Sequence, residues 1–238
     1  MTKAFFIDTT VCTGCRGCQV ACKQWHDLPA EETENRGSYQ NPSDLSAMTY
    51  KLVRMREEEI DGKLRWLFFP DQCRHCLDAP CKGTAMYEEA IYQEPATGAI
   101  LYTMATRELN AQEIIDSCPY NIPRKGPDGV LAKCDMCIDR VINGQLPACV
   151  KTCPTGAMNF GDREEMLQLA DRRLAEARKK FPKASLLDPD EVSVIYLVAY
   201  DRSHYEVAAR ARTPEGLTRQ AALRKMISPL TRSVAHIG

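Results

Sequence analysis

The twelve cysteines of this 238-residue sequence include a group whose spacing suits metal ligation. This group has the form C-x2-C-x2-C-x3-C and contains Cys12, Cys15, Cys18 and Cys22. Three thiolates two residues apart on one loop can each meet a different iron of one cube. The fourth thiolate, one helical turn farther on, points toward a neighbouring cube. Glycines within the run suit such a loop because its backbone must turn tightly. The spacing therefore indicates cubane iron–sulfur clusters.

The remaining cysteines form three further groups. They are Cys73, Cys76 and Cys81; then Cys118 alone; then Cys134, Cys137, Cys149 and Cys153. The dipeptides Cys118-Pro119 and Cys153-Pro154 match the Cys-Pro ending of bacterial ferredoxin runs. The C-x2-C pairs at Cys73 and Cys134 also occur in zinc sites, so a zinc-stapled interaction module is the competing interpretation. A disulfide framework is a further alternative, but such frameworks are typical of short secreted domains.

Composition excludes several other classes of function. The formal net charge is -1, with 26% charged and 44% hydrophobic residues, which is ordinary for a globular protein and gives no basic signal for nucleic acid. No segment approaches the roughly 20 apolar residues that span a bilayer. There is no glycine-rich nucleotide loop and no Ser/His/Asp order that would suggest a nucleophile. We therefore expect no independent catalytic site, no membrane span and no export signal at the N-terminus.

Secondary-structure patterns surround the cysteine groups. Residues 51–60 and 63–69 flank Asp61-Gly62 and predict a β-hairpin, and residues 90–93 and 99–102 predict another. Residues 27–48 are polar and predict a long surface loop. The first of these hairpins lies between the first two cysteine groups.

The C-terminal third contains no cysteine after Cys153. Residues 162–181 carry apolar side chains at helical spacing, which predicts a helix packed on its own domain. A strand is predicted at 192–200, a helix near 214–226, and a tail over the last dozen residues. This third is expected to be structural or partner-facing.

Together the four cysteine groups resemble the four-motif iron–sulfur subunits of the molybdopterin oxidoreductases. This family includes formate dehydrogenase β subunits and relatives among dimethyl-sulfoxide, nitrate and polysulfide enzymes, and the resemblance covers about residues 3–160. It implies an α+β fold of two interleaved bacterial-ferredoxin-like domains with a C-terminal helix and strand extension. The implied bounds are 1–50 plus 126–160 for the domain with two clusters, 51–125 for the domain with one, and 161–238 for the extension.

The resemblance also implies how the cysteines share three [4Fe–4S] clusters. Set A would be Cys12, Cys15, Cys18 and Cys153. Set B would be Cys22, Cys134, Cys137 and Cys149, with Cys149 the least regular in its spacing. Set C would be Cys73, Cys76, Cys81 and Cys118. The fourth cluster of the family would need cysteines where this chain has Ala85, Glu108, Ala111 and Ile114. All four ligands of that cluster are replaced together, which implies that it is lost.

Within the family, three complete sets without a C-terminal membrane helix resemble the small subunits of soluble tungsten or molybdenum formate dehydrogenases of sulfate-reducing bacteria. The implied role is a non-catalytic subunit that relays electrons between a large catalytic subunit and an external acceptor such as a cytochrome c. That large subunit would carry pterin-bound tungsten or molybdenum and its own cluster. The same ligands would also serve a thiosulfate, polysulfide or sulfoxide reductase, or a hydrogenase.

The resemblance also implies a location and a path. We expect an anaerobic protein, periplasmic by co-export with the catalytic subunit, with a cytoplasmic complex as the alternative. Set A is expected to face the catalytic subunit, set B to follow it, and set C to be the exit. Basic residues beside the cysteines are candidates for tuning cluster potentials: Arg16, Lys23, Arg74, Lys82, Lys133 and Lys151.

Overall fold

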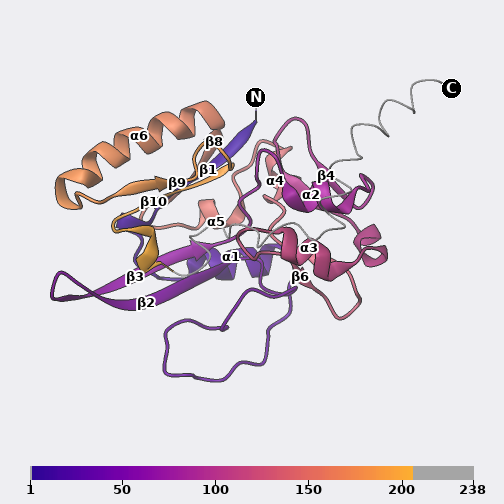
Figure 1. The fold of residues 1–238 in the computed structure, drawn as a ribbon, viewed down its shortest axis with the longest axis horizontal. Coiled ribbons are helices and arrows are strands. Elements are labelled where there is room, and N and C mark those ends of the chain that lie inside the picture. The colour runs from indigo at the N-terminus through magenta and orange to yellow at the C-terminus, as the bar shows by residue number, and fades with distance from the viewer. Residues whose placement is uncertain (1, 206–238) are drawn as a thin grey trace.

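The computed structural model describes residues 2–205, which form a mixture of short strands, short helices and loops (Figure 1). The strands are β1 Lys3–Asp8, β2 Leu52–Ile60, β3 Lys63–Asp71, β4 Ile91–Gln93, β5 Ile100–Tyr102, β6 Arg124–Lys125, β7 Leu131–Ala132, β8 Met158–Asp162, β9 Ser185–Leu187 and β10 Val194–Val198. The helices are α1 Gly17–Trp25, α2 Pro80–Ala85, α3 Ala111–Ser117, α4 Ile138–Val141, α5 Ala148–Lys151 and α6 Arg163–Lys180, with 3₁₀ turns at Thr9–Val11, Met104–Glu108 and Arg202–His204. This composition confirms the expected α+β class.

The largest sheet of the described residues has four strands in the order β8-β1-β10-β9. The strand β1 runs parallel to β10, with Phe5 opposite Val194, and antiparallel to β8, with Phe5 opposite Phe160. The inner strand β10 is buried along its whole length, as a continuous apolar run predicts. Strands from the two ends of the described chain therefore pair in one sheet.

The two faces of this sheet pack against different layers. Because side chains alternate along a strand, Ala4 and Phe6 of β1 point to the face that α6 covers through Met166 and Ala170. Phe5 and Ile7 point to the opposite face, which packs against cysteine-bearing segments and the β2–β3 hairpin. Figure 1 shows α6 lying along one side of the sheet, away from α1 and α5. The cysteines thus lie on the side of the sheet opposite α6.

The rest of the fold consists of two-stranded ladders and short helices. The hairpin β2–β3 extends from the body, and β4–β5 and β6–β7 are short two-stranded ladders. The helices α2 and α3 pack with β4 and β5 around a separate apolar cluster that includes Cys81, Ile91, Ile100 and Ile114. Strand pairing is sparse here, so loops and cysteines carry much of the organisation.

Most of the predicted elements are found. Both hairpins, the strand near 192–200 and the helix near 162–181 are confirmed, and no helix or strand occurs in residues 27–48. The helix predicted near 214–226 and the tail lie outside the described residues. The sheet joins β9 and β10, within residues 185–198, to the N-terminal strand β1. The domain bounds given above stay predictions. Within residues 2–205, every helix is too short or too polar to cross a bilayer.

Candidate iron–sulfur cluster sites

The same tight turn occurs at the first cysteine of two different groups. The N–H of His75 donates to Sγ of Cys73 at 3.4 Å, and the N–H of Met136 donates to Sγ of Cys134 at 3.5 Å. His75 and Met136 both have positive φ, 45° and 69°. The corresponding place in the first group is held by Gly14, with φ of 66°. Each turn folds an amide toward a sulfur and lets the next cysteine face the same space.

Two helical segments each position a pair of cysteines four residues apart. On α1, Cys18 and Cys22 lie on the buried face, one turn from each other. On α5, Cys149 is buried, and Cys153 follows after the helix end. The helices α1 and α5 pack against each other. By the assignment implied above, α1 would give one thiol to set A and one to set B, while α5 would give Cys149 to set B and the segment after it would give Cys153 to set A.

The thiols of set A influence one another directly. Burial raises the pKa of Cys12 to about 11, opposed by the N–H of Gly14 and reinforced by the thiolates of Cys18, Cys153 and Cys15. Burial would also raise the pKa of Cys153, but hydrogen bonds from the N–H of Met158, the hydroxyl of Thr155 and further N–H groups outweigh it and hold this pKa below its ordinary value. The structure therefore gathers the four cysteines of set A in one place.

The thiols of set B are more deeply buried. Burial raises the pKa of Cys22 well above its ordinary value, and the thiolates of Cys149 and Cys137 raise it further. The pKa of Cys134 is raised by burial and then by Cys22, and that of Cys137 is about 12 for the same leading reason. Cys149, the least regular of the assigned ligands, lies with the other three.

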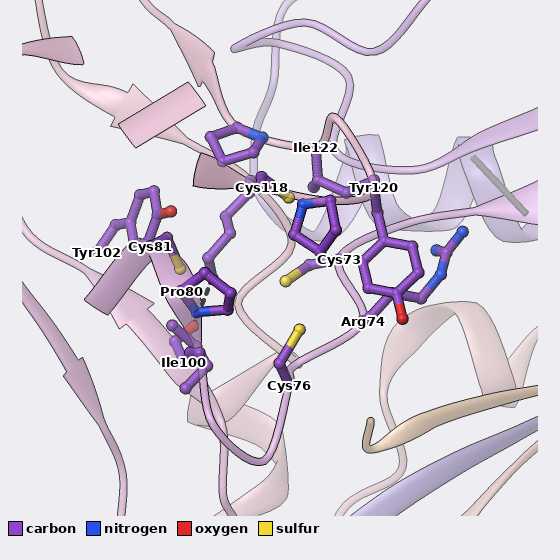
Figure 2. A pocket seen from close by; sticks show the side chains of 14 residues that line it. Cys73, Arg74, Cys76, Pro80, Cys81, Ile100, Tyr102, Cys118, Tyr120 and Ile122 are labelled. Carbon is purple, nitrogen blue, oxygen red and sulfur yellow. Dashed lines mark hydrogen bonds between the residues drawn. The ribbon is translucent and has the colours of Figure 1, made fainter. Parts of the chain in front are cut away.

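The thiols of set C line a single pocket. Figure 2 shows Cys73, Cys76, Cys81 and Cys118 around a shared space, with Pro80, Tyr120 and Ile122 forming part of its wall. Burial raises the pKa of Cys118 to about 12. Burial also raises the pKa of Cys76, reinforced by the thiolates of Cys73, Cys118 and Cys81. Apolar walls and four convergent thiols form a suitable cage for a metal–sulfur cluster.

Two polar groups at the set C pocket stand out. The buried hydroxyl of Tyr102 has no nitrogen or oxygen partner among residues 2–205, and it lies next to Cys81, where it opposes the effect of burial on the thiol pKa. The ammonium of Lys133 donates to the carbonyls of Ile100 and, at 3.0 Å, Cys134, and lies 4.5 Å from the centre of the Tyr102 ring. Both groups are hydrogen-bond donors or cations that suit an electron-rich sulfur cage.

The thiols of set B are electrostatically coupled to thiols of both other sets. The thiolate of Cys18 in set A raises the pKa of Cys149 in set B, after burial and against Lys51. The thiolate of Cys73 in set C contributes to the raised pKa of Cys134 in set B, after burial. Set B therefore has neighbours on both sides.

The chemistry of these thiols fits iron better than it fits a disulfide framework. All twelve cysteines are free, and the described chain contains no disulfide. Most of the thiols are buried and have raised pKa values, so a bound cation is needed to hold them ionised. The residues therefore fit cubane clusters, which require four thiolates each.

The positions of the expected fourth cluster are filled differently. Ala111 and Ile114 are buried in the apolar cluster with Cys81 and Ile91, and Ala85 packs against the same cluster. Glu108 is exposed. Aliphatic side chains thus occupy part of the place where the family has ligands, which agrees with the loss of that cluster.

Of the six basic residues expected to tune the clusters, the structure buries two, Arg74 and Lys133. The guanidinium of Arg74 pairs with Asp71 at 3.0 Å and lies over the ring of Tyr196, 4.5 Å from its centre. The other four are at least partly exposed: Arg16, Lys23, Lys82 and Lys151. Sequence reasoning did not single out Lys51, which is fully buried, because nothing in its local sequence marks it.

His26 also has a role that its sequence position did not show. Its Nε2 lies 2.9 Å from Asp135 Oδ1, and that oxygen accepts the N–H of Cys137 at 2.8 Å. One ligand atom each of His26, Asp135 and Cys137 lie within 4.8 Å of one another, a spacing compatible with a metal ion. Asp135 already accepts from two donors, and Cys137 belongs to set B. The contact of His26 with Asp135 is therefore better described as support for the loop of Cys134 and Cys137. The signal that could have found it is the Asp that follows Cys134.

Comparison with known proteins shows clear similarity. Residues 64–163 match the family described as 4Fe-4S dicluster domain. The chain is 57% identical over 215 residues to formate dehydrogenase subunit beta of Megalodesulfovibrio gigas, covering 89% of this chain and 100% of that protein. It is 53% identical over 212 residues to formate dehydrogenase 2 subunit beta (cytochrome c-553) of Nitratidesulfovibrio vulgaris, covering 86% and 97%. It is also 44% identical over 188 residues to the formate dehydrogenase-O iron-sulfur subunit of Escherichia coli, covering 78% of this chain and 62% of that protein.

Proposed function

The chain belongs to the family of formate dehydrogenase β subunits, the non-catalytic iron–sulfur subunits of an oxidoreductase complex, and on that basis we propose how it transfers electrons. Its twelve cysteines hold three [4Fe–4S] clusters in the sets A, B and C. The subunit relays electrons between a catalytic subunit with pterin-bound tungsten or molybdenum and an external acceptor. Each cluster, when bound, takes up and releases one electron at a time.

The observation that carries this proposal is the proximity of set B to both other sets. The charge of Cys18 in set A affects the pKa of Cys149 in set B, and the charge of Cys73 in set C affects the pKa of Cys134 in set B. Three complete groups of four thiols account for every cysteine of the sequence. A purely structural metal site would not need such a row across two halves of the fold.

The chain's own residues keep this row in place. The helices α1 and α5 pack together and fix thiols of sets A and B relative to each other. Apolar side chains and prolines surround the sulfurs of set C and limit their contact with water. Low access of water and fixed N–H donors both influence the potential of a cluster.

The partner and location remain part of the proposal. The name of the relative from N. vulgaris mentions cytochrome c-553, and we propose a c-type cytochrome as the acceptor for this chain as well. Set A faces the catalytic subunit and set C is the exit. The complex is periplasmic by co-export with the catalytic subunit.

The test is metal analysis of the complex after anaerobic purification. Three clusters predict about twelve irons and about twelve acid-labile sulfides per chain, with a broad brown absorbance that bleaches on dithionite. About eight of each would mean that one set is wrongly assigned. Zinc in place of iron would overturn the electron-transfer proposal. The metal and substrate of the co-purifying large subunit decide between formate and the sulfoxide, thiosulfate, polysulfide or hydrogen alternatives.

A further inference from the structure

The ammonium group of Lys51 is a buried charge without a carboxylate partner. Only 1% of Lys51 is exposed, and it is among the largest fully buried side chains. Its Nζ donates to the carbonyl of Pro70 at 3.3 Å and to the side-chain oxygen of Gln72. Among residues 2–205, no acidic side chain forms an ion pair with it. An isolated buried charge is costly, so some other negative group must compensate it.

The acidic side chain that stands between the two acceptors of Lys51 is already paired with other cations. Asp71, between Pro70 and Gln72, lies 2.7 Å from Nε of Arg54 and 3.0 Å from a guanidinium nitrogen of Arg74. Asp71 is itself buried, and its one negative charge is shared between two guanidinium groups. The counter-charge of Lys51 therefore has to come from another part of the molecule.

The residues that follow Lys51 contact cysteine-bearing segments of the fold. The next residue, Leu52, packs in a cluster with Cys73 and Cys134. One residue farther, the N–H of Val53 donates at 3.1 Å to the side chain of Gln19, which adjoins Cys18 on α1. The segment that begins β2 thus contacts both α1, which carries Cys18 and Cys22, and the loop that carries Cys134.

The electrostatics of the thiols agree with this placement. Burial alone would lower the pKa of Lys51, but nearby negative charges, those of Cys18 and Cys149 foremost and then those of Tyr196 and Cys134, outweigh burial and hold the pKa above its ordinary value. In return, the charge of Lys51 is the largest effect that lowers the pKa of Cys18 against burial. It is also the largest effect that lowers the pKa of Cys149. Cys18 belongs to set A and Cys149 to set B.

We propose that Lys51 is the shared counter-ion of the two neighbouring clusters of sets A and B, and that its charge raises the reduction potential of both. This inference rests on the proposed function, because it takes the three thiol sets as cluster ligands. Four thiolates give a cubane cluster a net negative charge that grows when an electron enters. A fixed cation in a low-dielectric site stabilises that added charge on either side. Lys51 is a positioning residue, since it donates no ligand.

Lys133 provides a matched comparison. It too is buried, donates only to carbonyl oxygens and lacks an acidic partner among the described residues, but it lines the pocket of set C. A neutral substitution at Lys133 should therefore change the potential of the set C cluster, while one at Lys51 should change the other two. Comparing the two variants separates the effect of a lost charge on the nearby clusters from a general loss of protein stability.

The experiment is a redox titration followed by electron paramagnetic resonance on the purified complex carrying Lys51→Met. Iron and sulfide are counted first, and wild-type counts test the proposed function separately. We expect two of the three midpoint potentials to fall and the third to stay, with the reverse pattern in Lys133→Met. Three unchanged midpoints, or only one changed midpoint, would overturn the inference.

Further variants keep the test decisive if Lys51→Met loses iron. Lys51→Gln retains a donor for the Pro70 carbonyl without the charge, and Lys51→Arg retains the charge. Iron lost from Lys51→Met and Lys51→Gln but kept in Lys51→Arg supports a required counter-ion. Iron lost equally from all three shows that only the shape of the lysine matters, and it rejects the proposal.

Discussion

At the scale of single residues, the tight turns beside the cysteines are the features with the clearest physical requirement. Gly14 has φ of 66°, and a Cβ added there would lie 2.8 Å from the ring of Phe68. A left-handed conformation costs a residue with a Cβ about 1–2 kcal/mol, and the clash adds to this cost. Phe68 lies on β3, so the hairpin and the cysteine loop fit each other closely.

We expect Gly14→Ala to disturb set A specifically. The purified variant should lose iron, from about twelve to about eight atoms per chain, as metal analysis would show. Gly144→Ala is the matched control, because Gly144 has φ of 70° but nothing within 4 Å of its added Cβ. Equal iron content in both variants would show that the contact with Phe68 does not matter.

A second residue-scale prediction concerns the hydroxyl of Tyr102. Because it stands beside Cys81 without a nitrogen or oxygen partner, it can donate to sulfur and stabilise the reduced cluster of set C. Tyr102→Phe should lower one midpoint potential in a redox titration and leave two unchanged. Tyr92→Phe, on the paired strand β4 and partly exposed, should leave all three as they are. A change of the same size in both variants would rule out the hydrogen bond as the cause.

At the scale of elements, the sequence predicted what local pattern controls. The alternation and turn residues around Asp61-Gly62 specify the β2–β3 hairpin, and the apolar stripe from Met166 specifies α6. The close spacing of Cys12, Cys15 and Cys18 is likewise local, although the structure places Cys18 in the first turn of α1 rather than on the loop. Such features need no knowledge of the rest of the chain.

What the sequence could not predict depends on distant pairing. Nothing local in Val194–Val198 indicates that this strand pairs in parallel with β1, about 190 residues away. Lys51 resembles any lysine before a strand until Pro70, Gln72 and the thiols of α1 and α5 surround it. The contact of His26 with Asp135 joins residues more than 100 positions apart. The ligand sets themselves stay a prediction that metal analysis of the variants has to test.

One carboxylate of the long loop before β2 joins this loop to two strands. Asp44 lies 2.6 Å from Arg54 on β2 and 2.6 Å from Arg124 on β6. Burial would raise the pKa of Asp44, but hydrogen bonds from Arg54 and Arg124 outweigh it and lower the pKa below its ordinary value. A carboxylate with a depressed folded pKa contributes stability above its unfolded pKa of about 3.9, and this is lost as the pH falls through the folded value.

Asp44→Asn should therefore lower the free energy of unfolding by about 1 kcal/mol at neutral pH, since the group is partly exposed and solvent screens it. The difference from wild type should shrink below about pH 4, and urea unfolding at several pH values would measure it. Glu176→Gln, which removes an exposed pair with Lys179, should change little at any pH. A pH-independent difference at Asp44 would point to shape rather than charge.

At the scale of the whole molecule, the proposed row of sets A, B and C would give the subunit a direction. The catalytic subunit and the acceptor must reach opposite ends of the row for all three clusters to matter. Set C depends on Cys118, which comes from a separate segment after α3 and completes the pocket of Cys73, Cys76 and Cys81. Removing this one thiol should therefore interrupt the far end and leave the near end intact.

In the complex with Cys118→Ala, we expect formate to bleach the remaining clusters at the wild-type rate, while reduction of a c-type cytochrome falls to near background. The physical reason is that electrons still enter at set A but lose the last site before the acceptor. Ser117→Ala is the control, since its hydroxyl only bonds the carbonyl of Ile114 and it should behave as wild type. Stopped-flow absorbance would follow both reactions in one sample.

If the variant still reduces the cytochrome normally, the acceptor takes electrons from set A or B, and set C is not the exit. If bleaching also fails, electrons enter through set C, and the order has to be reversed.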